Sequence, residues 1–304
     1  MKKRAIETAL AKKRAEVAKK KDEVAKNTAL ILSVPEIKTA HEKYVNAAFK
    51  NALGGFEKEE KAAKDAYIKA LKDHGYDESD MTYTPACPIC KDTGNAGGKL
   101  CKCVWDEYIL ALKEICDIDA CAPFAFSDAD FDGIKNENLR RELEKLYEYF
   151  KLYAQKLPNT KAKIITLCGG TGTGKTSLAS AVAREAVERG KSVKFVSAYG
   201  FDTAMLNSHT SPTDEKLGRI SDYLTADLLV IDDLGTEPIL KNVTEPYLLL
   251  VLEERENKGL CTLITTNLSP ARILNRYGER VYSRLASKQN SRIFKIDGKD
   301  LRLN

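Results

Sequence analysis

The sequence has no long hydrophobic run, and this absence excludes a protein that crosses a membrane as helices. Such a helix needs about 18 consecutive apolar residues, and no stretch of the 304-residue chain approaches that length. The first residues are basic, but the apolar run that follows, 30–32, is too short for the core of a secretory signal. With 31% charged residues, the chain is expected to be soluble and cytoplasmic, with no membrane partner.

Acidic residues are scarce at the start of the chain. Residues 1–50 hold 13 Lys and Arg but only 6 Asp and Glu, a net charge of +7, whereas the rest of the chain holds 36 basic and 38 acidic residues, a net charge of −2. The whole positive excess therefore lies in this N-terminal arm. Such an arm can contact nucleic acid or an acidic protein surface, and a solvated lysine-rich helix explains the same composition equally well.

Disulfide bonds are not expected, because eight cysteines without an export signal are typical of a reducing compartment. Four of them form two close pairs separated by ten turn-rich residues: Cys87 with Cys90, and Cys101 with Cys103. Two such pairs can close a tetrahedral thiolate site around Zn²⁺, and the lack of an evident open position favours a structural role. The second pair is separated by one residue rather than two, so Cys116 and His74 are alternative ligands. An iron–sulfur cluster or a set of free thiols would also fit this pattern.

The first part of the chain has the pattern of three helices. Residues 1–32 place an apolar residue at every seventh position of one stripe. This spacing predicts a long helix that needs a partner, since Lys13 and Lys20 interrupt the second apolar stripe. The sequence Ser33-Val34-Pro35-Glu36 predicts a capping box and the start of a second helix, which ends near Gly54-Gly55. A third helix is expected to follow.

In the second half of the chain, β-like runs alternate with helical patterns. The runs cover 164–168, 193–197, 227–231, 261–265 and 291–296. This alternation predicts an α/β fold in which a mostly parallel sheet carries helices on both faces.

A glycine-rich loop with a lysine follows the first of these runs. Residues 169–176 read Gly-Gly-Thr-Gly-Thr-Gly-Lys-Thr, and a helical pattern follows over 177–189. The pattern G-x-x-x-x-G-K-[ST] between a strand and a helix is typical of a phosphate-binding loop, in which Lys175 reaches the β- and γ-phosphates and Thr176 binds Mg²⁺. The glycines let backbone N–H groups face a phosphate, and the helix N-terminus adds its positive dipole end. The predicted nucleotide-binding residues are Gly169, Gly170, Thr171, Gly172, Thr173, Gly174, Lys175, Thr176 and Ser177.

Polar side chains come directly after two of the later β-like runs, and two arginines come further along the chain. Asp232 and Asp233 end the run 227–231; the first is expected to anchor Mg²⁺, usually through water, and the second to orient the attacking water. Asn267, after the next run, can hydrogen-bond the γ-phosphate or that water. Arg280 and Arg284 share a helix face. An arginine there can complete a neighbouring subunit's site, and a solvated helix arginine is the alternative.

The glycine-rich loop, the two acids, Asn267 and the two arginines follow one another along the chain. In this order they resemble the motifs of the bacterial helicase-loader ATPases of the DnaC/DnaI type. They are also similar to those of IstB, a transposition helper ATPase of the same AAA+ group. The cysteine pattern of 87–103 resembles the zinc-bearing N-terminal region of the DnaI-like branch, which favours the loader. The resemblance covers roughly residues 80–304. It implies an AAA+ P-loop NTPase fold. Together with the helical patterns at the start of the chain, it predicts four parts: a helical N-terminal region (1–78), a four-cysteine zinc-binding module (79–118), a linker and helix (119–160), and the ATPase domain (161–304).

The resemblance also implies roles for matching residues. Asp232 takes the place of the Walker B acid, and Asp233 stands where many AAA+ proteins carry glutamate, so the shorter side chain implies slow hydrolysis. Asn267 matches sensor 1. Arg284 matches the arginine finger that acts on the next subunit, and Arg302 matches the sensor 2 arginine.

The implied activity is ATP-dependent helicase loading. The N-terminal region would bind the replicative hexameric DNA helicase, and the protein would deliver it to single-stranded DNA during DNA replication. ATP or ADP, Mg²⁺ and Zn²⁺ are the implied cofactors, and self-association through the ATPase domain is implied by the trans-acting arginine. The segment 199–224 takes the place of extra helices that line up along DNA, where Lys216, Arg219 and Tyr223 are the candidate contacts and solvated helix residues the alternative.

Three further functions remain open on the sequence. An IstB-like helper would bind duplex DNA and a transposase. A small-molecule P-loop kinase would need a phosphate-acceptor pocket and an arginine-rich lid, neither of which is evident. A nucleotide-gated adaptor would bind ATP with negligible hydrolysis.

Overall fold

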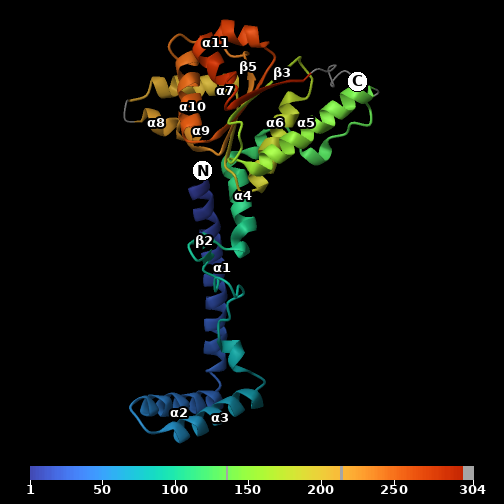
Figure 1. Cartoon of the computed structure of the whole chain (residues 1–304). Helices are drawn as coiled ribbons and strands as arrows, with labels where there is room; N and C mark the ends of the chain where they lie inside the picture. The colour runs from blue at the N-terminus through green and yellow to red at the C-terminus, as the bar shows by residue number, and fades with distance from the viewer. Residues whose placement is uncertain (135, 213–214, 297–304) are drawn as a thin grey trace. The chain divides into compact units, whose positions relative to one another are not determined.

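The computed structural model describes residues 1–134, 136–212 and 215–296 (Figure 1). The chain divides into two compact units: Glu7–Asp106 forms one, and Met1–Ile6 with the chain from Glu107 onward forms the other. The division into four parts at 78/79, 118/119 and 160/161 stays a prediction. Among the described residues, no helix combines the length and the apolar character that crossing a membrane requires.

The unit Glu7–Asp106 contains three long helices, as the sequence predicts: most of α1 (Lys2–Ile31), α2 (Pro35–Ala52) and α3 (Glu57–Asp73). α2 and α3 pack against each other. A buried apolar cluster joins them to the end of α1; it consists of Ile31, Ile37, Tyr67 and Leu71. The rest of the unit is mostly loop, with η1 (Glu78–Met81), a small hairpin of β1 (Asn95–Ala96) and β2 (Lys99–Leu100), and η2 (Lys102–Val104).

The predicted capping box at Ser33 is wrong. Val34 is the N-cap of α2, and no side chain caps this helix. The Ser33 hydroxyl instead donates to the Leu30 carbonyl at 2.6 Å, at the end of the preceding helix. Pro35 occupies the first turn, where a missing N–H removes one of the donors that a cap would otherwise have to satisfy.

The partner that α1 needs lies in the same unit. The segment around Gly94 passes so close to α1 that a Cβ on this glycine would lie 2.6 Å from Leu10 Cδ2. Lys13, which interrupts the apolar stripe, has a mostly buried side chain and lies 3.4 Å from the Asp92 carboxylate. The lysine therefore pairs with a specific buried acid, so the break in the stripe is part of how α1 contacts the segment that follows α3.

The second unit is built on a five-stranded sheet with the order β4-β5-β6-β3-β7, in which every neighbouring pair is parallel. The strands are β3 (Ile164–Gly169), β4 (Val193–Ser197), β5 (Leu228–Leu234), β6 (Cys261–Thr266) and β7 (Ser291–Ile296). The α/β fold with a parallel sheet is thereby confirmed. The five observed strands match the five β-like runs to within three residues at either end.

Helices cover both faces of this sheet (Figure 1). One face carries α7 (Ala198–His209), α10 (Thr244–Asn257) and α11 (Pro270–Leu285), whose apolar residues share one buried cluster with those of the strands. α6 (Lys175–Glu188) packs across β3, β4, β5 and β6, and α5 (Glu137–Lys156) packs on α6. The unit also contains most of α4 (Trp105–Cys116), the short segments η3 (Ile118–Ala120) and η4 (Phe126–Asp128), and the short helices α8 (Lys216–Arg219) and α9 (Ser221–Thr225).

Parallel strands end at one common edge, where ligands bind in open α/β sheets. At this edge β3 leads into the glycine-rich loop, β5 carries the two acids, and β6 leads to Asn267. The order of the strands places β6 between β3 and β5. The fold thus brings together three segments that are far apart in the sequence.

Candidate nucleotide-binding site and cysteine cluster

The loop between β3 and α6 has the backbone conformation that its glycines allow. Gly172 and Gly174 have φ angles of 75° and 86°, in the left-handed region where a side chain is strained. Gly174 is the N-cap of α6 and provides no side-chain cap. The first-turn N–H groups of a helix have no partner within the helix, so an anion can accept from them. This loop therefore fits a phosphate group.

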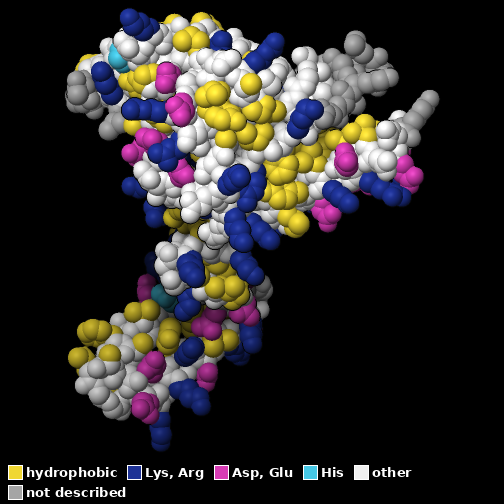
Figure 2. Space-filling model, turned by 45° about the horizontal axis from the view of Figure 1, so that its top comes forward, with side chains coloured by type: hydrophobic (Ala, Val, Ile, Leu, Met, Phe, Trp, Pro, Cys, Tyr) yellow, Lys and Arg dark blue, Asp and Glu magenta, His cyan; other side chains and the backbone are white. Residues whose placement is uncertain are grey.

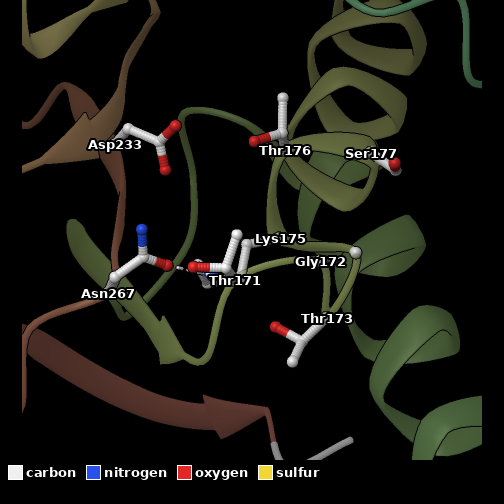
Figure 3. A pocket seen from close by; sticks show the side chains of 9 residues that line it. Thr171, Gly172, Thr173, Lys175, Thr176, Ser177, Asp233 and Asn267 are labelled. Carbon is white, nitrogen blue, oxygen red and sulfur yellow. Dashed lines mark hydrogen bonds between the residues drawn. The ribbon is translucent and has the colours of Figure 1, made fainter. Parts of the chain in front are cut away.

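A pocket opens directly over this loop (Figure 3). Figure 3 shows Asp233 and Asn267 across the pocket from the loop and from the first turn of α6. The lining combines most of the predicted loop residues with polar side chains from two other strands: Thr171, Gly172, Thr173, Gly174, Lys175, Thr176, Ser177, Asp233 and Asn267.

Lys175 connects the loop to the end of β6. Its side chain is buried, and its Nζ donates to the carbonyl oxygens of Gly169 at 3.1 Å and Gly170 at 2.6 Å. Nζ also donates to Asn267 Oδ1 at 2.7 Å, across 92 positions of sequence. The structure thus brings the loop lysine and the predicted sensor residue into direct contact.

Asp232 lies next to Thr176. The Thr176 hydroxyl is 3.1 Å from both oxygens of the Asp232 carboxylate, and the Thr265 hydroxyl donates to the same carboxylate at 2.6 Å. Burial is the main reason why the pKa of Asp232 is raised, and the nearby charge of Asp233 raises it further, while the hydroxyl hydrogen bonds lower it. A hydroxyl and a carboxylate side by side are oxygen ligands of the kind that Mg²⁺ prefers, so the pair fits this ion.

Asp233 faces the pocket because β5 is irregular at this point. The register between β5 and β6 shifts between Ile231 and Leu234, as in a β-bulge, and Asp233 has a φ of 56°. A bulge redirects the side chains that follow it. The Asp233 N–H donates to Thr265 Oγ1 at 2.8 Å, so this threonine contacts both acids. Thr265 is a site residue that the sequence pattern does not single out.

Of the two arginines that the resemblance singles out, Arg284 does not line this pocket. Arg284 pairs with Glu253 at 2.9 Å and with Glu256 at 3.2 Å, both on α10, and about 44% of its side chain is exposed. Its action on a neighbouring subunit stays a prediction. Arg302 lies outside the described residues.

Of the three predicted DNA contacts in 199–224, the aromatic residue, Tyr223, is not available at the surface. Tyr223 is 7% exposed and packs edge-on against Phe201, so it is a core residue and its ring is not available to stack on a base. Arg219 pairs with Glu215 one turn earlier, at 2.8 Å. Lys216 is partly exposed.

A second, apolar cavity adjoins the glycine-rich loop, and the sequence reasoning missed it. It is lined by Phe124, Phe131 and Tyr147 on one side and by Thr173, Gly174 and Ser177 on the other. Phe131 and Tyr147 pack edge to face with ring centroids 5.0 Å apart. An aromatic cavity beside a phosphate-binding loop has the character of a site for the base of a nucleotide. The aromatic stretch 124–131 is visible in the sequence, but nothing in it indicates that it lies beside the loop.

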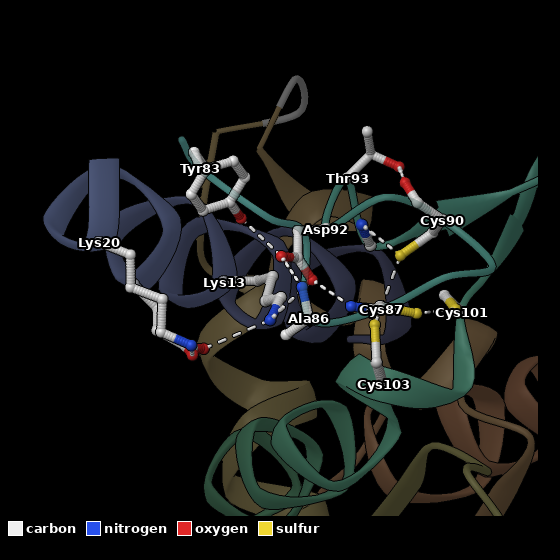
Figure 4. Close-up of polar contacts among 12 residues, drawn as sticks. Lys13, Lys20, Tyr83, Ala86, Cys87, Cys90, Asp92, Thr93, Cys101 and Cys103 are labelled. Carbon is white, nitrogen blue, oxygen red and sulfur yellow. Dashed lines mark hydrogen bonds and ion pairs between the residues drawn. The ribbon is translucent and has the colours of Figure 1, made fainter. Parts of the chain in front are cut away.

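The four paired cysteines converge in the other unit (Figure 4). Their sulfur atoms all lie within 4.8 Å of one another, with 3.8 Å between Cys87 and Cys101 and 3.5 Å between Cys90 and Cys103. Tetrahedral Zn–S bonds of about 2.3 Å place the sulfur atoms about 3.8 Å apart. The cluster therefore fits a zinc ion. None of the eight cysteines forms a disulfide.

The alternative ligands lie elsewhere. The His74 ring contacts the Ala70 carbonyl at 2.9 Å through Nδ1, and Cys116 accepts a hydrogen bond from the Val193 N–H at 3.3 Å. Within the cluster, the Gly94 N–H donates to Cys90 Sγ at 3.3 Å. Burial raises the pKa of Cys90, but this bond and those with the neighbouring thiols outweigh it and bring the pKa to about 7.

Asp92 lies beside the cysteine cluster and accepts hydrogen bonds from the backbone that carries it (Figure 4). Its buried carboxylate accepts from the N–H groups of Ala86 at 2.8 Å and Cys87 at 3.0 Å and from the Tyr83 hydroxyl at 2.5 Å. These bonds, with the charge of Lys13, hold its pKa well below the ordinary value in spite of burial. The aspartate orients the backbone of a cysteine in the way that polar groups around a metal ligand do. The sequence shows an aspartate in the loop but not this role.

Comparison with known proteins finds similarity to an ATP-binding family and to replicative helicase loaders. Residues 151–286 match the model of the family described as IstB-like ATP binding protein. The replicative helicase loader DnaI of Bacillus subtilis is 30% identical over 130 residues, which cover 42% of this chain and 40% of that protein. The replicative helicase loader DnaC of Escherichia coli strain K12 is 29% identical over 117 residues, which cover 38% of this chain and 47% of that protein. A crystal structure of DnaI covers 62% of this chain and 92% of that chain at 24% identity, with a TM-score of 0.43.

These matches confirm the resemblance on which the sequence reasoning rests. Residues 151–286 are similar to the IstB-like ATP binding proteins, and the chain is similar to replicative helicase loaders. The similar region spans less than half the length of these two helicase loaders.

Proposed function

We propose, from the IstB-like ATP-binding region of residues 151–286, that this protein is an ATPase that loads the replicative hexameric DNA helicase onto single-stranded DNA during DNA replication. The observation that carries the proposal is the meeting of Lys175, Asn267, Thr176 and Asp232 at one edge of the sheet. The similarity to helicase loaders favours this function over an IstB-like role in transposition.

In this proposal each residue of the pocket has a distinct task. The N–H groups of 170–174 and the Lys175 ammonium bind the β- and γ-phosphates, and the aromatic cavity of Phe131 and Tyr147 takes the base. Thr176 and Asp232 hold Mg²⁺, which when bound neutralises charge on the phosphates. Lys175 exchanges its bonds to the loop carbonyls and Asn267 for bonds to phosphate oxygens.

The two polar side chains across the pocket would act on the attacking water and on the γ-phosphate. Asp233 orients this water and accepts its proton at a carboxylate oxygen. Asn267, released from Lys175, donates through its side-chain amide to the γ-phosphate. Arg284 is available to a neighbouring subunit once it leaves Glu253 and Glu256, and ATP would therefore promote self-association through the ATPase domain.

Replacing Asp233 by asparagine tests whether the protein hydrolyses ATP or only binds it. The amide keeps the shape of the side chain but cannot accept the proton, so turnover should fall by about 100-fold or more. ATP affinity should be retained, because Lys175 and the loop are unchanged. Phosphate release and titration with a fluorescent ATP analogue measure the two quantities.

Asp233→Glu is the matched comparison, since it keeps the charge and adds the methylene that many AAA+ proteins have here. It should keep measurable turnover. Equal turnover of the wild type and Asp233→Asn would show that Asp233 does no chemistry and would support a nucleotide-gated adaptor.

The apolar end of the α2–α3 hairpin supports a role in protein binding. Phe49 and Leu53 are 68% and 77% exposed, and Phe56 beyond them is 43% exposed. Figure 2 shows apolar side chains gathered at the end of this hairpin. An exposed apolar cluster of this kind marks a protein contact more often than a solvated surface. In the proposed function the helicase is the partner.

Co-elution of the purified chain with a candidate hexameric helicase, with and without ATP and Mg²⁺, tests the proposed function directly. A Phe49→Ser, Leu53→Ser double variant should weaken the complex by about 2 kcal/mol or more, roughly thirty-fold, as expected when apolar anchors are removed. Leu30→Ser, which alters a residue that is 62% exposed at the end of α1, is the control and should bind as the wild type does. A chain that ignores the helicase but binds duplex DNA and a transposase would support the IstB-like function instead.

A further inference from the structure

A buried carboxylate lies where the loop after β5 meets α11. Glu237 is 3% exposed. Its Oε2 accepts from the Gly235 N–H at 2.8 Å, within its own loop. Its Oε1 accepts from the Tyr277 hydroxyl, and the Arg276 guanidinium lies 3.6 Å from the same oxygen and donates to the Glu237 carbonyl. One side chain thus joins the loop to two consecutive residues of α11.

This arrangement is more specific than apolar packing would be. Burying a carboxylate is unfavourable unless donors surround it, and a well-packed apolar side chain often gives equal or greater stability at such a position. Burial, and then the hydrogen bond to Glu237, raise the pKa of Tyr277 far above its ordinary value, so its hydroxyl remains a donor at physiological pH. The contact therefore holds the two elements in one defined geometry.

On one side, the loop that carries Glu237 is continuous with residues of the candidate nucleotide-binding pocket. The loop follows the last two residues of β5, Asp233 and Leu234, and Asp233 lines the pocket. Gly235 lies directly against Leu268, since a Cβ on this glycine would be 2.6 Å from Leu268 Cδ1. Leu268 is the residue after Asn267, the hydrogen-bond partner of Lys175. The segment 233–237 thus lies between the polar residues of the pocket and α11.

On the helix side, the contact lies at a break in α11. Gly278, the residue after Tyr277, has φ 77° and ψ 172°, which are not helical, so α11 consists of two segments. The second segment carries Arg280 and Arg284. The side chains of Arg276 and Tyr277 hold the end of the first segment, and the second is held by Val281 and Leu285 in the core and by the Arg284 pairs with α10.

We propose that Glu237 is a positioning residue that links the loop of Asp233 to the second segment of α11, and so sets how Arg280 and Arg284 are presented to a neighbouring subunit. The inference rests on the proposed function, in which this pocket binds ATP. When nucleotide binds, a shift of Asp233 or Asn267 moves the loop after β5. Glu237 passes this movement to Tyr277. The break at Gly278 then lets the second segment of α11, which carries the two arginines, change its position.

The test compares the full-length wild type with Glu237→Gln and Tyr277→Phe. Three properties are measured: affinity for a fluorescent ATP analogue, turnover with its KM, and amide hydrogen exchange of 279–285 with and without the analogue. Glu237→Gln should keep ATP affinity and KM within about twofold and lose about tenfold in kcat, since a positioning residue acts after binding. The effect of nucleotide on exchange in 279–285 should disappear. Tyr277→Phe, which removes a single donor and keeps the ring, should change the same quantities less.

Glu279→Gln is the matched control, because it alters an exposed carboxylate on the same helix; it should behave as the wild type does. Variants that unfold at lower temperature but keep normal turnover and a normal nucleotide effect on exchange would show that Glu237 is only a structural support, and would overturn the inference. If Glu237→Gln fails to fold, Tyr277→Phe decides by the same criteria. A wild type that does not bind ATP would overturn the proposed function itself, and the inference with it; that result is distinguished by the affinity measurement.

Discussion

Lys175→Ala is expected to abolish detectable ATP binding. In the proposed complex the ammonium contacts two phosphates, and a hydrogen bond to a charged group contributes about 1.5–3 kcal/mol. Losing two such bonds lowers the affinity by about 100-fold or more. The variant also loses the three bonds that Nζ makes to Gly169, Gly170 and Asn267. Calorimetric titration with ATP and Mg²⁺ measures the affinity.

Lys161→Ala is the matched control, because this lysine is exposed just before β3 and outside the pocket. It should bind ATP as the wild type does. A Lys175→Ala protein that is folded and retains its affinity would contradict the assignment of the pocket, and the proposed function would fail with it.

Replacing Cys87 and Cys90 by serine is expected to remove a bound metal and to unfold residues 80–104. A structural zinc site contributes about 10 kcal/mol or more to folding, so a segment with so little regular structure depends on it. The wild type should contain one zinc per chain, and a chelator should reproduce the effect of the variant. Metal analysis of freshly purified protein and limited proteolysis of 80–104 measure the two effects.

Cys116→Ser is the control for this variant, since Cys116 belongs to the other unit and accepts a hydrogen bond from the Val193 N–H. It should keep the metal. Freshly purified wild type without zinc would refute the zinc site, and iron with visible absorbance would indicate an iron–sulfur cluster. ATP affinity should be unchanged in the Cys87, Cys90 variant, because the pocket is formed wholly by the other unit.

The parts of the fold that the sequence predicted well depend on local patterns. The β-like runs match the strands because a strand buried on both faces is apolar throughout its length. The loop 169–176 was recognisable because its glycines, lysine and threonine stand at the fixed spacing, within eight residues, that is typical of phosphate-binding loops. The helix pattern of 1–32 was equally visible. Its capping signal was not reliable, since a serine hydroxyl can bond backward to Leu30 as easily as forward.

The contacts that make the site depend on residues far apart in the chain. Lys175 and Asn267 meet because β3 and β6 are neighbours in the sheet. The different positions of Asp232 and Asp233 arise from the irregularity in β5 and from Thr265 on the adjacent strand, which bonds to both. Nothing within either segment shows the register of its partner, so the sequence could name the residues but not their geometry.

The sequence by itself determined the α/β class, and it predicted a phosphate-binding loop, its acids and the four clustered cysteines, because each is encoded by residue types at short spacing. Only the tertiary structure decided that Asp92 and Lys13 support the cysteine cluster, that Tyr223 belongs to the core, that an aromatic cavity adjoins the loop, and that Glu237 joins the loop of Asp233 to α11. The physical reason is the same in each case. Burial and pairing are properties of surfaces that meet in space, and these surfaces exist only once distant segments have packed together.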